Sequence, residues 1–141
     1  MQIKVMIEPQ DIAQCFEAFL ELRPSLTDKQ AFVDQVLAQQ KEGYQIVAVF
    51  HEDQVVACIG FRIMTFLAWG KILYIDDLIT REAFRGKGYG KALLTYATDF
   101  AVQNGCGQVH LDTGYARYAA HKAYLTHGFE LHCHHLALQL G

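Results

Sequence analysis

The stretch R-G-K-G-Y-G-K at residues 85–91 decides how the chain is interpreted. An apolar, strand-like run at residues 72–80 precedes it, and a helical pattern at residues 89–103 follows from it. Glycines at alternate positions let the backbone approach a ligand closely, because no Cβ stands in the way. A helix that begins there directs unpaired N–H groups and the positive end of its dipole at the loop. Strand, glycine loop and helix N-terminus together predict a phosphate-binding site.

Two well-known phosphate loops are excluded by single residues. A P-loop, G-x-x-x-x-G-K-[ST], requires a hydroxyl after its lysine, but Lys91 is followed by Ala92. The dinucleotide fingerprint G-x-G-x-x-G requires a glycine where Lys91 or Leu93 stands. The loop is therefore expected to hold a different phosphate-bearing ligand.

Outward from the loop, hydrophobic periodicity predicts the other elements. Strands are predicted at residues 2–7, 44–50, 55–64, 71–80, 108–112 and 130–140. A first helix is expected to begin at Pro9 and to end before Pro24, and a second to begin at Thr27 in a capping box with Gln30. Two later helices are predicted at residues 89–103 and 116–127, the last ending at Gly128.

The predicted order is β-α-α-β-β-β-α-β-α-β, in a single domain that spans residues 1–141. Three successive strands with short turns predict an antiparallel meander. The strand-helix-strand step from residue 73 to residue 111 predicts a right-handed crossover between parallel strands. The fold class is therefore α/β (α+β), with a mixed, mostly antiparallel sheet and helices on both faces.

Composition limits the function. The chain has 141 residues, 52% of them hydrophobic and 19% charged, which suits one compact domain. Its net charge of −3 predicts no nucleic-acid partner, and no apolar run or signal pattern predicts a membrane or export. The four scattered cysteines form no C-x-x-C pair, so we expect no zinc site, and a reducing, cytoplasmic location.

Arg85-x-x-Gly88-x-Gly90 after an apolar strand resembles the acyl-CoA-binding signature R/Q-x-x-G-x-G/A of the GNAT superfamily of N-acetyltransferases. A second motif is similar to that family's later helix, namely Arg117-x-x-Ala120-His121-x-x-Tyr124-x-x-x-Gly128-Phe129. The resemblance covers residues 73–129, and the element order fits the whole chain. Many members have asparagine where Arg117 stands; R-x-x-A-H-x-x-Y is similar to one sub-branch, and the usual asparagine contact to the cofactor is not carried over.

The resemblance implies acetyl-CoA as cosubstrate and a set of binding residues. The loop amides would hold the pyrophosphate, and the strand edge at residues 78–80, opened by a β-bulge there, would bind the pantetheine arm. Arg117 or Lys122 would reach the phosphates at the adenine end. The predicted cofactor-binding residues are Leu78, Ile79, Thr80, Arg85, Gly86, Lys87, Gly88, Tyr89, Gly90, Lys91 and Arg117.

Three residues are predicted to be catalytic. The resemblance gives Tyr124 the role of protonating the departing thiolate. Asp76 and Asp77 are adjacent in the strand, where alternation would turn them to opposite faces, and carboxylates in an apolar strand are costly unless paired or hydrated. One of them, Asp76 first, would anchor an amine and accept its proton; the alternative, that both make surface or bulge hydrogen bonds, stays open. Residues 74–77 are also similar to the equivalent stretch of polyamine acetyltransferases.

The histidines carry weaker hypotheses. His121 could relay protons, but a helix histidine satisfied by a neighbour is favoured. The H-C-H-H stretch at residues 132–135 places too few ligands on one strand face for a zinc site, so no metal is expected. A strand that lines a cleft or a dimer edge is favoured instead, and the apolar run at 136–140 suggests a homodimer.

The sequence thus predicts an N-acetyltransferase that moves an acetyl group from acetyl-CoA to a primary amine of a small molecule, such as a polyamine or another cationic amine. The amine would attack directly in a ternary complex. The alternatives are an acyl-CoA-binding sensor or partner module without turnover, acetylation of a protein or peptide amine, and a metal-dependent hydrolase that uses the C-terminal histidines.

Overall fold

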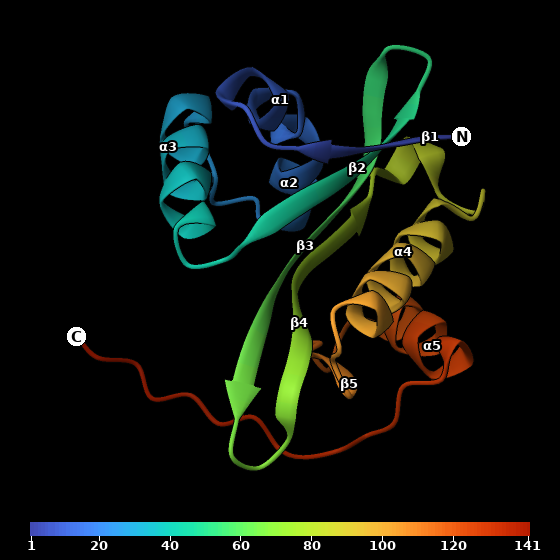
Figure 1. Ribbon diagram of the computed structural model, residues 1–141. Coiled ribbons are helices and arrows are strands. Elements are labelled where there is room, and N and C mark those ends of the chain that lie inside the picture. The colour runs from blue at the N-terminus through green and yellow to red at the C-terminus, as the bar shows by residue number, and fades with distance from the viewer. The chain divides into compact units, whose positions relative to one another are not determined.

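Five strands form one sheet in the order β1-β2-β3-β4-β5 in a computed structural model that describes residues 1–141 (Figure 1). β1 to β4 pair antiparallel with their neighbours, whereas β4 and β5 pair in parallel. The antiparallel meander and the parallel strand-helix-strand step are therefore confirmed. The strands are β1 Gln2–Met6, β2 Gln45–His51, β3 Gln54–Phe66, β4 Gly70–Thr80 and β5 Gln108–Leu111.

Helices cover both faces of this sheet, as predicted (Figure 1). On one face, Ile46 and Ala48 of β2 join a core cluster with residues of the first three helices. On the other face, the Phe61 ring of β3 lies 5.2 Å from the Phe100 ring of α4. The helices of residues 1–111 are α1 Pro9–Gln14, α2 Phe16–Leu22, α3 Lys29–Gln40 and α4 Tyr89–Gln103, with a 3-10 turn, η1, at Glu82–Phe84.

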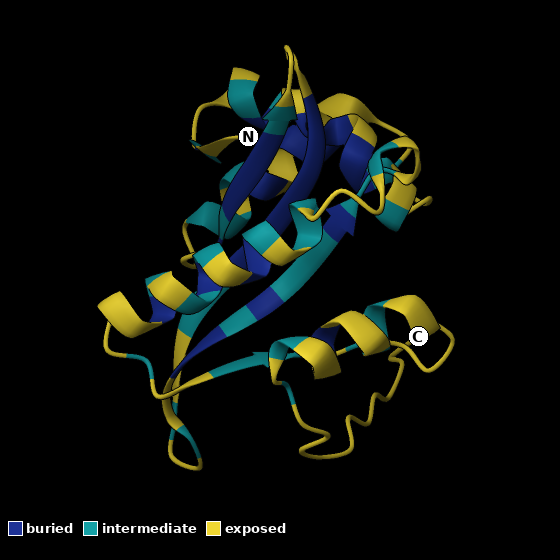
Figure 2. Ribbon diagram, turned by 90° about the vertical axis from the view of Figure 1, so that its right-hand side faces the viewer, coloured by how far each residue is buried: buried dark blue, intermediate teal, exposed yellow.

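The core of residues 1–111 is built from strand residues and from the helix sides that face them (Figure 2). The Phe32 ring centroid of α3 lies 5.6 Å from the Phe16 centroid and 5.3 Å from the Phe19 centroid. These aromatic side chains therefore pack α3 against α2. Burying such rings removes large apolar areas from water and supplies much of the stabilisation. α4 buries a stripe of small and aliphatic residues, Leu93, Leu94, Ala97 and Ala101.

Two predicted helix boundaries were wrong. The first predicted helix is two helices, because α1 ends at Gln14, Cys15 is the cap residue between them, and α2 begins at Phe16. The predicted capping box of Thr27 and Gln30 is absent, since Asp28 is the N-cap of α3 and accepts a hydrogen bond of 3.1 Å from the Ala31 amide. A carboxylate satisfies that amide and also faces the positive end of the helix dipole.

Residues 112–141 form a second compact unit, which we describe by itself. Its helix is α5, Tyr118–His127, which begins later than predicted and ends at Gly128 with a left-handed φ of 117°. The Phe129 ring lies 5.8 Å from the Tyr124 ring. The helix stop at Gly128 is therefore confirmed.

The last predicted strand, residues 130–140, was wrong. These residues have no regular secondary structure, and their leucines are exposed (Figure 2). A strand exists only where its backbone pairs with another strand, and residues 112–141 contain none. The homodimer stays a prediction without the strand on which it rested. No helix in the structure is long and apolar enough to span a bilayer.

Candidate active site

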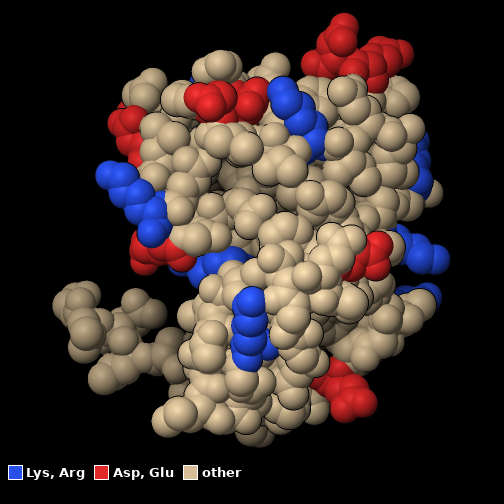
Figure 3. Space-filling view, viewed as in Figure 1, with Lys and Arg blue, Asp and Glu red and all other residues tan.

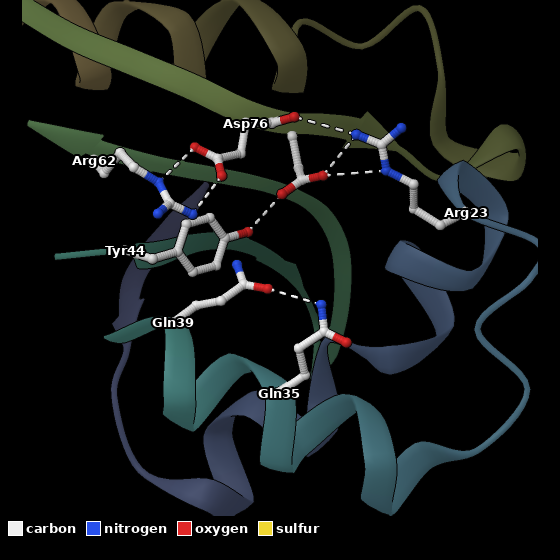
Figure 4. Close-up of polar contacts among 7 residues, drawn as sticks. Arg23, Gln35, Gln39, Tyr44, Arg62 and Asp76 are labelled. Carbon is white, nitrogen blue, oxygen red and sulfur yellow. Dashed lines mark hydrogen bonds and ion pairs between the residues drawn. The ribbon is translucent and has the colours of Figure 1, made fainter. Parts of the chain in front are cut away.

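A β-bulge interrupts β4 at the two adjacent acids. Gly60 of β3 pairs with Asp77, but the next residue, Phe61, pairs with Ile75, so Asp76 is the extra residue. An extra residue breaks the alternation of side chains, and both carboxylates lie on the face that α1, α2 and α3 cover (Figure 4). The prediction of opposite faces was wrong for this reason. The predicted bulge at residues 78–80 was also wrong, because the register there is regular.

Arg62 holds the Asp76 carboxylate with two hydrogen bonds. Its Nε donates to Oδ1 over 3.1 Å, and its Nη2 donates to Oδ2 over 2.6 Å. The side chains are only 16% and 21% exposed, so water screens this ion pair weakly. The Arg62 guanidinium also lies over the Tyr44 ring, with 5.2 Å between Cζ and the ring centroid. The two hydrogen bonds thus fix the guanidinium in the plane of the carboxylate, and the Tyr44 ring packs against one face of the guanidinium.

Asp77 is held by a different set of partners. The Tyr44 hydroxyl donates to Oδ2 over 2.7 Å, and Arg23 donates to Oδ1 from Nη2 over 2.8 Å and from Nε over 3.2 Å. Arg23 ends α2, and its Nη2 also donates to the Asp76 carbonyl over 3.2 Å (Figure 4). Both acids therefore make the bulge hydrogen bonds that the alternative interpretation expected. Two guanidinium groups and two carboxylates leave the cluster with no net formal charge.

Gly60 makes room for this arrangement. A Cβ at Gly60 would overlap the hydroxyl and the ring of Tyr44, so the tyrosine can pass over the strand only because residue 60 has no side chain. Tyr44 then reaches Asp77 across the same strand pair. A glycine inside an apolar strand is therefore the feature that allows the tyrosine to support the bulge.

Burial sets the protonation of the cluster. Burial raises the pKa of Asp76, the neighbouring Asp77 charge adds to this, and the hydrogen bonds and charge of Arg62 lower it, with a net result above the usual range. Burial, followed by the Asp77 charge, raises the pKa of Tyr44 well above its ordinary value. The Tyr44 hydroxyl therefore remains a hydrogen-bond donor at neutral pH.

Beyond the bulge, one edge of β4 is open. β5 pairs with β4 only from Ile72 to Ile75, so the backbone from Asp76 to Thr80 has no strand partner on that side. Such an edge offers N–H and C=O groups to an extended molecule. The predicted pantetheine-binding residues Leu78, Ile79 and Thr80 all lie on this edge.

The glycine loop follows directly after this edge. The Arg85 Nε donates to the Thr80 carbonyl over 3.2 Å, which ties the loop to the strand end. Gly86 and Gly88 have φ values of 78° and 84°, left-handed conformations that suit glycine, and space around both is open. Gly88 is the N-cap of α4. The sequence alone located this loop and its helix start correctly.

The first turn of α4 leaves backbone donors available. The first bond of the helix runs from the Ala92 amide to the Gly88 carbonyl over 3.0 Å, so the amides of Tyr89, Gly90 and Lys91 have no carbonyl of the helix to bind. The Lys87 ammonium lies 5.5 Å from the Phe84 ring centroid, beside the loop. These donors and this cation fit a phosphate group.

The Glu21 carboxylate of α2 binds the segment that leads from β4 into the loop. Glu21 accepts from the Glu82 amide over 2.8 Å and from the Arg81 Nε over 3.0 Å. Burial raises the pKa of Glu21, but these hydrogen bonds and the Arg81 charge outweigh it, so the pKa is lowered. α2 therefore contacts both ends of the open edge, through Arg23 at the bulge and through Glu21 at η1.

In the second unit, Tyr124 is buried and Arg117 is the N-cap of α5. Burial raises the pKa of Tyr124, while the nearby Arg117 acts in the opposite direction, and the net result is a raised pKa. The Tyr124 hydroxyl is therefore protonated at neutral pH. The His121 Nε2 donates to the Gly114 carbonyl over 2.7 Å, which confirms the interpretation of His121 as satisfied by a neighbour.

The C-terminal histidines are the remaining candidate metal ligands of the chain. His135 pairs with Asp112 over 3.0 Å, and both side chains are well exposed. The structure contains no group of three or more His, Cys, Asp or Glu side chains that could hold a metal ion.

The charged side chains on the face shown in Figure 3 are scattered rather than gathered in one patch.

Four supporting residues, Arg23, Tyr44, Gly60 and Arg62, were not predicted from the sequence. Two signals could have found Arg62 and Gly60: Arg62 is the only charged residue of β3, and Gly60 interrupts the same apolar run. Only the bulge, however, brings Arg62 and Asp76 to the same face. The sequence around Arg23 carries no signal that its side chain reaches Asp77.

Known proteins resemble this chain over most of its length. Residues 10–129 match the acetyltransferase (GNAT) family. An uncharacterised N-acetyltransferase of Bacillus subtilis, YhdJ, is 34% identical over 125 residues, which are 88% of this chain and 87% of that protein. Streptothricin acetyltransferase of Streptomyces lavendulae is 36% identical over 70 residues, 50% of this chain and 37% of that protein. The solved structure of AAC(6')-Iy with the bisubstrate analogue CoA-S-monomethyl-acetylneamine shares the fold, with a TM-score of 0.81, 14% identity and coverage of 100% and 99% of the two chains.

Proposed function

The chain belongs to the acetyltransferase (GNAT) family, and on this premise we propose that it transfers the acetyl group of acetyl-CoA to a primary amine of a small molecule. The observation that carries the proposal is the open edge of β4. A carboxylate at the bulge stands at one end of this edge, and a glycine loop with unpaired amides follows the other end. The carboxylate suits an amine, and the loop amides suit the phosphates of a thioester cosubstrate that lies along the edge between them.

Acetyl-CoA supplies an activated acyl group, and the chain's own residues fit such a cosubstrate. The amides of residues 88–91 and the Lys87 ammonium would bind its pyrophosphate. The pantetheine arm would accept and donate backbone hydrogen bonds along Leu78, Ile79 and Thr80. The bond from Arg85 to the Thr80 carbonyl would hold the loop at the end of β4. Arg117 is proposed to bind the adenine-end phosphates on the family resemblance alone.

We assign the proton transfers to two groups. The Asp76 carboxylate would take a proton from the acceptor ammonium, directly or through one water, so that the nitrogen lone pair can attack in the ternary complex. Its raised pKa favours this role, because a base titrating nearer to neutrality holds the proton better. Tyr124 would give its hydroxyl proton to the departing thiolate, and its protonated state supports this. Asp77 is engaged by Tyr44 and Arg23, which favours a supporting role for it.

The acceptor is proposed as a small-molecule amine. Two similar proteins are associated with small molecules: streptothricin acetyltransferase, and AAC(6')-Iy, whose solved structure contains a CoA-acetylneamine bisubstrate analogue. Asp76 and Asp77 each have a guanidinium partner, so a polycationic acceptor meets no uncompensated negative charge here. A polyamine would therefore have to compete with Arg23 or Arg62 for these carboxylates.

The test is thiol release from acetyl-CoA over a panel of a polyamine, amino acids, an aminoglycoside, streptothricin and a peptide with a free N-terminus. We expect release that depends on one class of small amine. Asp76→Asn should lower that turnover by about 100-fold or more, the usual contribution of a general base. Tight acetyl-CoA binding without release for any amine would instead support a non-catalytic acyl-CoA-binding module.

A further inference from the structure

We propose that Arg62 is a positioning residue for the reaction: its two hydrogen bonds keep the Asp76 carboxylate ionised and aimed, so that Asp76 can accept the acceptor's proton. The inference rests on the proposed function for the role of Asp76. It adds a residue of β3 that no motif contains, and it assigns that residue to the charge state of the base.

The geometry favours a fixed orientation over a chance surface contact. Arg62 and Asp76 meet in a bidentate arrangement in which both carboxylate oxygens are engaged. The guanidinium is held in place by the Tyr44 ring, which lies 5.2 Å from Cζ. Tyr44 is itself fixed by its hydroxyl bond to Asp77 and by the space over Gly60. The Arg62 side chain therefore has few other positions to occupy.

Removing this cation would leave the carboxylate in an unfavourable setting. Asp76 is half-buried beside the Asp77 charge, and both conditions favour its protonated form. The charged or titratable groups that face the pair from the surrounding elements are Arg23 at the end of α2, Glu42 and Tyr44 before β2, Cys58 of β3, and Asp77 of β4. Of these only Arg23 is cationic, and its bonds go to the Asp77 carboxylate and the Asp76 carbonyl.

The proton step shows why ionisation matters. When a carboxylate oxygen takes the proton, one N–H bond of the ammonium breaks, one O–H bond forms, and the electron pair stays on nitrogen. A carboxyl group that already carries a proton cannot do this. Arg62 therefore controls the fraction of molecules whose Asp76 is competent at a given pH, without itself touching the substrate.

The test titrates Asp76 directly and measures activity in parallel. Protein labelled with ¹³C at the aspartate carboxyl is titrated by NMR as wild type, Arg62→Met and Arg62→Lys, with Asp76→Asn to assign the signal. We expect the Asp76 midpoint to move to higher pH in Arg62→Met and to return most of the way in Arg62→Lys. The acid limb of kcat/KM should move in the same direction, with about a tenfold loss at pH 6 that narrows to about threefold at pH 9.

Matched controls separate this role from a general loss of structure. Arg23→Met removes the other guanidinium of the cluster and should move the Asp76 midpoint less, because Arg23 does not bond that carboxylate. Circular dichroism and Tm show whether each variant is folded; Arg62→Gln, which keeps donors without charge, replaces Arg62→Met if that variant does not fold.

The outcomes of the two proposals are distinguishable. An Asp76 midpoint that is the same in folded wild type and Arg62→Met would overturn the role of Arg62, whatever the activity. A wild-type pH profile that Asp76→Asn leaves unchanged would overturn Asp76 as the base, and with it the positioning role. Wild type without amine-dependent thiol release would overturn the proposed function and the catalytic role of Asp76, whereas the NMR titration would still show whether Arg62 sets the ionisation of Asp76.

Discussion

The two ends of the open edge of β4 are built in opposite ways. At the bulge, Asp76 and Asp77 each have a guanidinium partner, and the polar atoms there are engaged by side chains of the same chain. At the glycine loop, the amides of residues 89–91 have no partner inside α4, and the space around Gly88 is open. The loop thus offers free backbone donors, whereas the bulge holds its own charges in balance.

This contrast suggests what each end contributes to the reaction. A set of preformed, unpaired donors gives affinity for a phosphate group at no cost in lost internal bonds. A paired and half-buried carboxylate gives little affinity for a cation but a controlled protonation state. We therefore expect changes at the loop to act on binding, and changes at the bulge to act on pH dependence and stability.

The largest effect is expected from Gly88→Val, which would break the loop end. Gly88 has a φ of 84°, which a β-branched residue adopts only under strain, and the new side chain would occupy the space at the helix start. We expect acetyl-CoA affinity to fall by about 100-fold or more, measured by isothermal titration calorimetry below the Tm of the variant. An unchanged dissociation constant would refute the loop assignment.

Gly105→Val is the matched control for this substitution. Gly105 follows the other end of α4, with a φ of 75° and open space around it, so the strain is similar but no phosphate site is proposed there. It should cost about 1–3 kcal/mol of stability and leave acetyl-CoA affinity within about twofold. Equal losses of affinity in both variants would point to strain rather than to a phosphate site.

A smaller effect is expected from Tyr124→Phe, which tests the chemical step and leaves both the glycine loop and the bulge unchanged. If the hydroxyl protonates the thiolate, its removal should lower kcat by about 10- to 100-fold, at the low end for a general acid because a thiolate leaves readily. Affinity for acetyl-CoA should stay within about twofold, since the ring is kept. Steady-state kinetics and calorimetry together check this, and an unchanged kcat would remove Tyr124 from the mechanism.

The smallest effect is expected from Gly60→Ala, which would disturb the bulge end. The added Cβ would overlap Tyr44 and push its hydroxyl away from Asp77. We expect the free energy of unfolding in urea to fall by about 1–3 kcal/mol, with acetyl-CoA affinity little changed.

Gly107→Ala serves as the control for this substitution, because a Cβ there meets no atom within 4 Å. We expect it to change the free energy of unfolding by less than about 0.5 kcal/mol. Equal stabilities of the Gly60 and Gly107 variants would show that the position of Tyr44 does not require the absence of a side chain at residue 60.

Much of the fold could be predicted from sequence because local patterns carry it. The helix at Tyr89–Gln103 has the predicted bounds, and the five strands that form differ from prediction only at their ends. The failures have physical causes: Asp28 competes with Thr27 as a cap, and residues 130–140 have a strand-like composition but form no strand pairing. Residue alternation also fails wherever a bulge adds a residue, as it does at Asp76.

The sequence by itself determined the family, the glycine loop and the helix that begins in it. These depend on residues close together in the chain, and the conformation of Gly88 and the first turn of α4 follow from local chemistry. Only the tertiary structure decided how the acids are used. Arg23, Tyr44, Arg62 and Asp76 come from four separate segments, and one extra residue in β4 turns both carboxylates to the same face, where pairing across strands and helices sets their charge (Figure 4).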